Sequence, residues 1–419
     1  MKKVVISGMV GNALEWYDYA LYAQFAPIIA QHFFPKSDLA EIMTMAVFAA
    51  GFFVRPLGAV VFGNIGDRFG RKLALTLGIL TMAVPTAAIG LLPSYNSIGI
   101  SATIILVLIR LIQGFSLGGE FSGCIAYIVE HSPPEKRGFA GSAAFVSMSI
   151  GMLMGSATAP IMSYYMDTEN LVNWGWRIPF IAGFFIGLVG LYIRMSLTES
   201  PLYRAAKASN TLSTTPLREI IKYYWPQLLM AIAIYITVTA PYYTATVYIE
   251  GLMNKLGYSK FESTTVSSII LITMIIVLPI SAKISDNIGR RPVLIMGVLA
   301  IIALTYPMFY LLGQMHFVLA IFSQIVFAAA VAFYMGPVPT VLVEIFPTRV
   351  RFTGVALSYN ISAAIFGGTA PMVAMLLVKW TGDKYSIAYY LSALAIFTFI
   401  VLRGFQESYH KSLTEKAVM

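Results

Sequence analysis

Twelve long apolar runs, separated by short polar connections, decide what this chain can fold into. A helix needs about 20 consecutive apolar residues to cross the hydrocarbon core of a bilayer, and each run is long enough to do so. The runs occupy residues 4–33, 41–65, 73–93, 98–129, 138–165, 176–198, 223–250, 262–283, 292–313, 317–343, 352–378 and 385–405. We therefore expect an all-α membrane protein with twelve transmembrane helices and no large domain outside the membrane.

Composition excludes the other broad classes. Charged residues make up 11% of the 419 residues, whereas a soluble domain has about a quarter. This excludes an ordinary cytosolic enzyme and a disordered chain. The runs do not alternate between polar and apolar residues, which argues against a transmembrane barrel.

One long polar stretch, residues 199–222, separates the runs into two sets of six. It contains several basic residues together with serine, threonine, asparagine and proline, a composition typical of a connection. We predict an N-terminal six-helix bundle at 1–198, a cytoplasmic linker at 199–222, and a C-terminal six-helix bundle with a short cytoplasmic tail at 223–419.

The positions of lysine and arginine predict the orientation, because cytoplasmic loops carry an excess of both. With the N-terminus in the cytoplasm, 20 of the 28 lysine and arginine residues fall in cytoplasmic segments, six fall on the opposite side, and Arg55 and Arg110 lie within spans. We therefore expect both termini in the cytoplasm.

The net charge of +9 follows these loops, so it indicates orientation and not nucleic-acid binding. No nucleotide-binding glycine loop with its lysine occurs, which argues against an ATP-driven pump. Cys124 is the single cysteine, and the four histidines form no metal-binding pair. We expect no metal and no cofactor, with a small-molecule substrate and the lipid bilayer as partners of a monomer.

The two halves repeat each other. YIVEHSPPEKR at 127–137 aligns with VLVEIFPTRVR at 341–351, so that Glu, Pro and Arg coincide at a constant offset of 214. The loop DRFGRK at 67–72 aligns with DNIGRR at 286–291. Matches at two equivalent loops predict a duplicated six-helix unit, which is one way to build a secondary transporter.

The first of these loops also carries a family resemblance. GNIGDRFGRK at 63–72 resembles the signature loop of the major facilitator superfamily, and RLIQGFSLGGE at 110–120 resembles the fourth-span motif of that superfamily. The resemblance implies a twelve-helix transporter whose two bundles rock about a central site.

Other segments resemble the metabolite:proton symporter family within that superfamily. They are GNALEWYDY at 11–19, RPLG at 55–58, LGGEFS at 117–122, WGWRIPF at 174–180 and ESP at 199–201. Residues 93–99 and 132–139 are most similar to the proline/betaine transporters. The resemblance implies proton-coupled uptake across a bacterial inner membrane.

Five charged residues lie inside the spans: Glu15, Asp18, Arg55, Arg110 and Glu120. Charge within a bilayer costs about 3 kcal/mol on insertion scales, so such residues are candidates for function. Their formal sum is −1, which indicates that they compensate one another. At about 1.5 Å per helical residue, Glu15 and Arg55 both lie about 16 Å from the cytoplasmic face.

We predict one buried network of Glu15, Asp18, Arg55 and Glu120, with Arg110 nearer the outside. A carboxylate in this network is the expected proton site, because burial and a nearby arginine act in opposite directions on its affinity for a proton. The competing interpretation is a static ion network that fixes helix packing.

Uncharged polar and aromatic side chains supply the expected substrate site. Aromatic faces can hold a quaternary ammonium, and Arg55 or Arg110 can hold a carboxylate. The competing interpretation is that most of these side chains pack helices together. The predicted substrate-binding residues are Asn12, Trp16, Tyr17, Arg55, Gln113, Tyr235, Tyr242, Tyr243, Gln324, Tyr334, Tyr359 and Asn360.

The repeated loops are the expected gates. Asp67 should face the N-terminus of the span that begins near 352, and Asp286 the start of the fifth span, because helix N-termini favour anions. We also expect Glu130 to pair with Arg137, and Glu344 with Arg351. The remaining predicted gating residues are Gly63, Arg68, Gly70, Arg71, Lys72, Gly289, Arg290 and Arg291. The competing interpretation is that the basic ones among them only set topology.

Several functions remain open at this point. A proton-coupled importer of a zwitterion such as proline or betaine leads, and a symporter of a di- or tricarboxylate such as α-ketoglutarate or citrate comes second. A proton-independent facilitator is also compatible with the sequence. A sensor would need an added signalling domain, and a membrane enzyme would need a metal or nucleophile cluster.

Overall fold

The computed structural model describes residues 2–35, 40–383, 385–409 and 411–413, and within these ranges the chain is helical with no strand. The α-helices are α1 Lys2–Gln24, α2 Ala26–Phe33, α3 Ala40–Arg68, α4 Arg71–Leu91, α5 Tyr95–Ile98, α6 Ile100–Glu130, α7 Arg137–Tyr165, α8 Thr168–Asn170, α9 Arg177–Met195, α10 Pro201–Ala208, α11 Pro216–Tyr223, α12 Trp225–Tyr243, α13 Ile249–Leu256, α14 Lys260–Ile288, α15 Arg290–Leu312, α16 Phe317–Met335, α17 Val338–Ile345, α18 Arg351–Ser362, α19 Ala370–Thr381 and α20 Ser386–Gly404. A 3₁₀ turn, η1 Pro134–Lys136, precedes α7. Three π-helical segments are η2 Leu171–Gly175, η3 Thr244–Tyr248 and η4 Ala363–Gly367.

Helix length and composition agree with the predicted spans. In the described ranges, eleven helical segments are long and apolar enough to cross a membrane. The remaining long helix, α1, has 23 residues and carries Glu15 and Asp18 in its second half. The predicted all-helical membrane fold with twelve spans is therefore confirmed.

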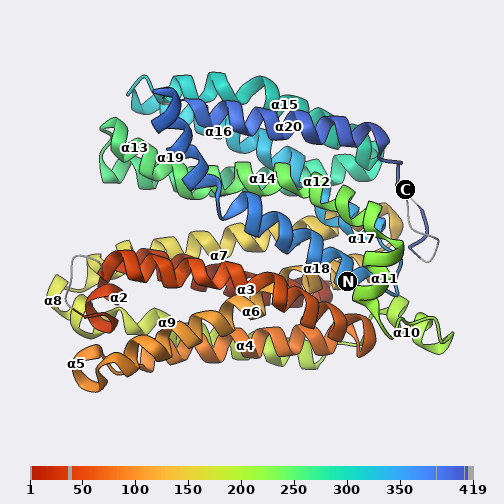
Figure 1. Ribbon diagram of the computed structural model, residues 1–419, viewed down its shortest axis with the longest axis horizontal. Coiled ribbons are helices and arrows are strands. Elements are labelled where there is room, and N and C mark those ends of the chain that lie inside the picture. The colour runs from red at the N-terminus through yellow and green to blue at the C-terminus, as the bar shows by residue number, and fades with distance from the viewer. Residues whose placement is uncertain (1, 36–39, 384, 410, 414–419) are drawn as a thin grey trace.

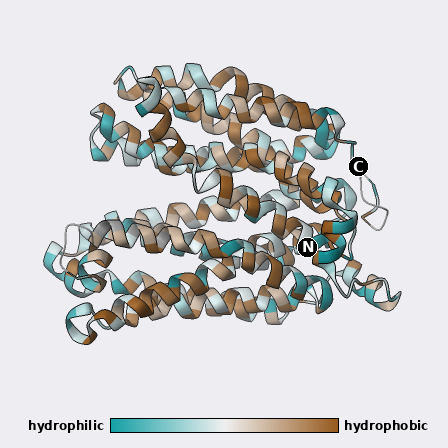
Figure 2. Cartoon of the chain, viewed as in Figure 1, coloured by the Kyte–Doolittle hydropathy of each residue, from teal (hydrophilic) through white to brown (hydrophobic). Residues whose placement is uncertain are grey.

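The long helices run side by side, and their ends define two faces of the molecule. The helices α10 and α11, the start of α1 and the end of α20 all lie at one end, on the right of Figure 1. We call this the linker end, and the opposite end, which carries α5, α8 and α13, the far end. Hydrophilic residues gather at both ends, and the hydrophobic ones lie mostly between them (Figure 2). This distribution matches a slab of hydrocarbon around the middle of the helices.

Contacts between helices fall into two sets, one within each half of the chain, and further contacts join the two halves. In the first half α1 packs on α7, α3 on α6 and α4 on α9, and in the second half α16 packs on α14 and α15. The most extensive contacts between the sets are those of α7 with α14 and of α3 with α18, and α6 also contacts α18. The predicted limits at 198 and 223 remain a prediction.

Glycine lets α3 approach α6 closely enough to bury an arginine. A Cβ on Gly58 would overlap the carbonyl of Phe115, and a Cβ on Gly118 would overlap the carbonyl of Arg55. Small residues at such crossings allow close backbone packing in membranes. The approach carries Arg55 into the interior, where its side chain is 1% exposed.

Candidate functional site

Glu15 and Arg55 form the central pair of buried charges. The Arg55 Nη2 atom lies 3.9 Å from the Glu15 Oε1 atom, and each side chain is 1% exposed. Within the described part of the chain, neither carboxylate oxygen of Glu15 accepts a hydrogen bond. Arg55 instead donates to the hydroxyl of Tyr359, 2.5 Å away on α18. Arg55 thus joins a carboxylate of its own half to a hydroxyl of the other half.

Asp18 belongs to a second cluster. Arg110 donates to Asp18 at 2.9 Å and to the Gln113 side-chain carbonyl at 2.7 Å. Gln113 and Thr86 each donate to the other carboxylate oxygen, Oδ1, of Asp18, at 2.9 and 2.8 Å. The Asp18 carboxylate is therefore paired and hydrogen-bonded, as a buried charge requires.

Glu120 pairs with Arg194 of α9, a residue that sequence analysis places among the cytoplasmic charges. Both side chains are buried, and the guanidinium donates to both carboxylate oxygens. The formal charge of the five predicted residues sums to −1, which could have indicated that one more buried base was needed. Arg194 is that base and brings the sum to zero.

The single predicted network needs correction in its pairing, because the ion pairs are Glu15 with Arg55, Asp18 with Arg110, and Glu120 with Arg194. Depth along a helix was the basis of the grouping, and depth does not fix the direction in which a side chain points. Asp18 lies only three residues from Glu15, yet it bonds to a different arginine on a different helix.

Part of the predicted substrate site does come together. A small cavity of about 10 Å³ lies between the two halves, and among its lining residues are Trp16, Tyr235, Tyr242, Tyr243 and Tyr359. Its volume is about that of one water molecule. These aromatic side chains therefore fill the centre of the molecule in this conformation.

Other predicted substrate residues make packing contacts elsewhere. Tyr17 donates to the carbonyl of Pro179, and Tyr334 donates to the carbonyl of Ile234. Gln113 belongs to the Asp18 cluster. The side-chain amide of Asn12 donates to the carbonyl of Ala144 and the hydroxyl of Ser147, and that of Gln324 donates to the hydroxyl of Ser323. The side-chain amide of Asn360 donates to the carbonyls of Gly118 and Ala356.

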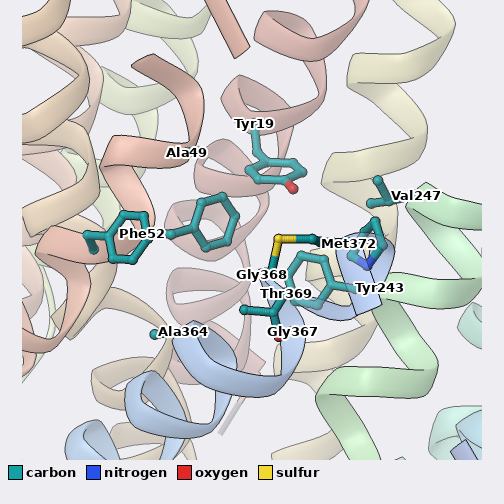
Figure 3. Close-up of a pocket in the computed structure, with 12 residues that line it drawn as sticks. Tyr19, Ala49, Phe52, Tyr243, Val247, Ala364, Gly367, Gly368, Thr369 and Met372 are labelled. Atoms are coloured by element: carbon teal, nitrogen blue, oxygen red, sulfur yellow. The ribbon is translucent and has the colours of Figure 1, made fainter. Parts of the chain in front are cut away.

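A larger cavity of about 340 Å³ lies beside the central aromatic residues. Tyr19, Phe52, Tyr243 and Met372 point into it from α1, α3, α12 and α19 (Figure 3). Tyr19 and Phe52 are not among the predicted site residues. Their positions in the sequence could have identified them, because Tyr19 lies three residues after Trp16 and Phe52 lies three residues before Arg55, and Trp16 and Arg55 are predicted site residues.

The two predicted aspartate gates contact helix N-termini at the linker end. Asp67 accepts hydrogen bonds from the backbone N–H groups of Phe352 and Thr353, at 3.1 and 2.9 Å. Asp286 accepts from the backbone N–H groups of Gly138 and Phe139, both at 2.8 Å. Each aspartate thus reaches from one half to the first turn of a helix in the other half.

The predicted pairs of Glu130 with Arg137 and of Glu344 with Arg351 are wrong. Glu130 contacts Arg71 at 3.2 Å within its own half and Arg351 at 2.9 Å across the halves. Glu344 contacts Arg290 at 3.4 Å. The crossing of α3 with α18 brings the start of α18 to Glu130, which the sequence repeat alone does not reveal.

The other predicted gating residues shape the loops around these contacts. Gly70 and Gly289 have φ values of 116° and 102°, which favour glycine. Gly63 lies where a Cβ would meet the backbone of Thr353. Three basic residues complete the set. The Arg68 side chain is exposed, Lys72 donates to the carbonyls of Met195 and Leu197, and Arg291 donates to those of Leu402 and Arg403.

Two glutamates that sequence analysis did not select extend the repeat. Glu199 accepts hydrogen bonds from the backbone N–H groups of Arg71 and Lys72, and Glu407 accepts from those of Arg290 and Arg291. The serine after each glutamate donates to Glu130 or to Glu344. The dipeptide Glu-Ser follows the last span of each half, and this repetition could have identified both glutamates from the sequence.

Comparison with known proteins agrees with this architecture. The sequence profile of the family "Sugar (and other) transporter" matches residues 4–419. A "Putative proline/betaine transporter" of Staphylococcus aureus (strain COL) is 35% identical over 413 residues, covering 96% of this chain and 87% of that protein. The "Glycine betaine/proline/ectoine/pipecolic acid transporter OusA" of Dickeya dadantii (strain 3937) is 34% identical over 428 residues, covering 99% and 85%.

Among solved structures, the proton:xylose symporter XylE bound to 6-bromo-6-deoxy-D-glucose superimposes with a TM-score of 0.82. The alignment covers 99% of this chain and 97% of that chain, at 17% sequence identity, and so it shows the fold. The fold and the relatives together define a multi-pass membrane transporter of the major facilitator type, not an enzyme. The chain belongs to the Sugar (and other) transporter family.

Proposed function

We propose that this protein takes up a small zwitterion, of the proline or glycine betaine type, together with protons across a bacterial inner membrane. The transport cycle is alternating access, and the linker end faces the cytoplasm, as the excess of lysine and arginine there favours. The observation that carries the proposal is Glu15, a buried carboxyl group that accepts no hydrogen bond from the described residues and lies 3.9 Å from Arg55.

Glu15 is the proposed proton carrier because a buried carboxyl group without donors costs far less when it is uncharged. In this conformation the Arg55 guanidinium is shared with the Tyr359 hydroxyl of the other half. Opening of the linker end would separate α3 from α18 and release Arg55 from Tyr359. Arg55 could then close on Glu15, stabilise the carboxylate and release the proton on that side.

Uptake into proteoliposomes tests the role of Glu15. Collapse of an imposed proton gradient should abolish accumulation by the wild-type protein, while Glu15→Gln should allow exchange of substrate without accumulation. Tyr359→Phe should move the pH dependence of uptake to lower pH, because Arg55 would then stabilise the Glu15 carboxylate. Accumulation by Glu15→Gln that still follows the proton gradient would contradict the proposed role.

The substrate class is supported by the relatives, two of which carry proline and betaine in their names. The site itself offers one arginine for a carboxylate and aromatic faces for an ammonium group. A di- or tricarboxylate remains the alternative, because a second buried arginine, Arg110, is present. Unlabelled glycine betaine should compete with labelled proline for uptake, and α-ketoglutarate should not. The reverse order would favour the alternative.

Alternating access is supported by the contacts that close the linker end, above all the hydrogen bonds of Asp67 with the first turn of α18. Asp67→Asn weakens these bonds because it removes the charge that the helix N-terminus stabilises. We expect spin labels on the linker-end faces of the two halves to show a larger population of long distances in this variant. An unchanged distance distribution would show that Asp67 does not gate.

A further inference from the structure

Four aromatic side chains contact one another in a closed ring, and this ring lies between the two cavities. Ring centroids lie 5.4 Å apart for Trp16 and Tyr19, 5.8 Å for Tyr19 and Phe52, 6.1 Å for Phe52 and Tyr243, and 6.5 Å for Tyr243 and Trp16. We call these four residues the aromatic ring. They come from α1, α3 and α12, so the ring includes side chains of both halves.

The aromatic ring lies at the boundary between the larger and the smaller cavity. Tyr19 and Phe52 line the cavity of about 340 Å³, Trp16 lines the cavity of about 10 Å³, and Tyr243 lines both. Figure 3 shows Tyr19, Phe52 and Tyr243 around the larger space. A molecule in the larger cavity therefore meets aromatic faces before it can reach the centre of the protein.

Positive charge lies directly behind this boundary. The Arg55 Cζ atom lies 5.2 Å from the centroid of Phe52 and 5.2 Å from that of Tyr359. A simple cation at the ring would be repelled by the guanidinium. A zwitterion avoids this repulsion, because its carboxylate can face Arg55 while its ammonium group stays against the aromatic faces.

We propose that the aromatic ring of Trp16, Tyr19, Phe52 and Tyr243 is a binding subsite for a fully methylated ammonium group. This inference rests on the proposed function, in which Arg55 binds the carboxylate of the substrate. It adds the residues that select the cationic end of the substrate. Methylation suits such a site, since a fully methylated ammonium group has no N–H that needs an acceptor, and aromatic side chains recognise quaternary ammonium groups by cation–π attraction.

Binding to the purified protein in lipid nanodiscs tests the subsite without a proton gradient. The probes are glycine betaine and 3,3-dimethylbutanoate, which has the same shape and carboxylate but a neutral carbon in place of the ammonium nitrogen. Calorimetric titration should show tighter binding of glycine betaine to the wild-type protein. Phe52→Leu and Tyr19→Leu should each weaken betaine binding by roughly twofold to thirtyfold, the range for one cation–π contact.

Matched variants separate the ring from general packing. Phe52→Tyr retains an aromatic face and should bind glycine betaine like the wild-type protein, and Phe185→Leu, exposed on α9, should have no effect. Binding of 3,3-dimethylbutanoate should change little in Phe52→Leu. Equal weakening of both probes, or no binding of millimolar glycine betaine to the wild-type protein, would overturn the subsite. Selective binding without proton-driven uptake would leave the subsite standing and overturn the proposed coupling.

Discussion

Glu120 of α6 and Arg194 of α9 form a buried ion pair in which the guanidinium donates to both carboxylate oxygens. With this pair, the three acids within the first-half spans, Glu15, Asp18 and Glu120, are matched by three arginines, Arg55, Arg110 and Arg194. Two of the three pairs, Glu120 with Arg194 and Asp18 with Arg110, are hydrogen-bonded directly. Glu15 and Arg55 are not, and this difference selects them as the pair that can change during transport.

Loss of one member of the Glu120 pair should destabilise the fold. Arg194→Met leaves a buried carboxylate without its partner, and we expect the free energy of unfolding to fall by about 3–5 kcal/mol. Glu120→Gln/Arg194→Met should recover most of that loss. Denaturant titration in detergent micelles, followed by circular dichroism, measures both. Lys260→Met, which breaks the exposed pair with Glu250, is the control, with an expected loss of about 1 kcal/mol or less. A double variant no more stable than Arg194→Met would contradict this account.

Arg351 should hold the linker end closed more strongly than its counterpart in the repeat, Arg137. Both residues contact the opposite half, but Arg351 does so as an ion pair with the Glu130 carboxylate at 2.9 Å, whereas Arg137 donates a hydrogen bond to the uncharged carbonyl of Lys411. Arg351→Met should therefore expose the linker end more than Arg137→Met does. The measurement is the rate at which a water-soluble maleimide labels a cysteine introduced at Ala356, which is buried on α18, after Cys124 has been replaced by serine. Equal labelling rates in Arg351→Met and Arg137→Met would show that the two arginines contribute equally to closure of the linker end.

Glu199 and Glu407 should stabilise the first turns of α4 and α15. Each carboxylate accepts two backbone N–H groups that have no partner within the helix. Glu199→Gln and Glu407→Gln should each lower the free energy of unfolding by about 1 kcal/mol, as loss of a charged cap does. Hydrogen exchange of residues 70–75 and 289–294 should rise in the matching variant only. A rise in both segments for either variant would indicate a global effect instead.

His131 should make stability depend on pH. Burial lowers the pKa of His131 below its ordinary value of about 6.5, and its ring contacts the Tyr127 ring with 4.3 Å between centroids. The unfolded chain therefore binds the proton more readily, so the contribution of His131 is complete above about pH 6.5 and is lost as the pH falls. The drop in the unfolding midpoint between about pH 7.5 and about pH 5.5 should be smaller in His131→Gln than in the wild-type protein. An identical drop would exclude this residue as its source.

Hydropathy and the internal repeat predicted the fold and the helix N-termini that Asp67 and Asp286 contact, but not the partners of the buried charges. The gating role of the two aspartates stays a prediction. Asp67 and Asp286 were placed correctly because a helix N-terminus attracts an anion wherever the repeat brings one to it. Arg194 was missed because it lies at the end of an apolar run, where lysine and arginine normally mark the cytoplasmic face. Tyr19 and Phe52 were missed because several aromatic residues lie close together in each segment, and the sequence does not show which of them faces the cavity.

The sequence alone determined that this chain spans a membrane many times, that its two halves repeat, and that charged residues lie within its spans. These properties follow from hydropathy and motif spacing, which are read one segment at a time. The tertiary structure alone decided that Asp18 turns to Arg110, that Glu120 finds Arg194, and that Glu130 reaches Arg351 in the other half. Such partners depend on the rotation of each helix about its axis and on the helices that it touches, and both are set by packing across the whole molecule.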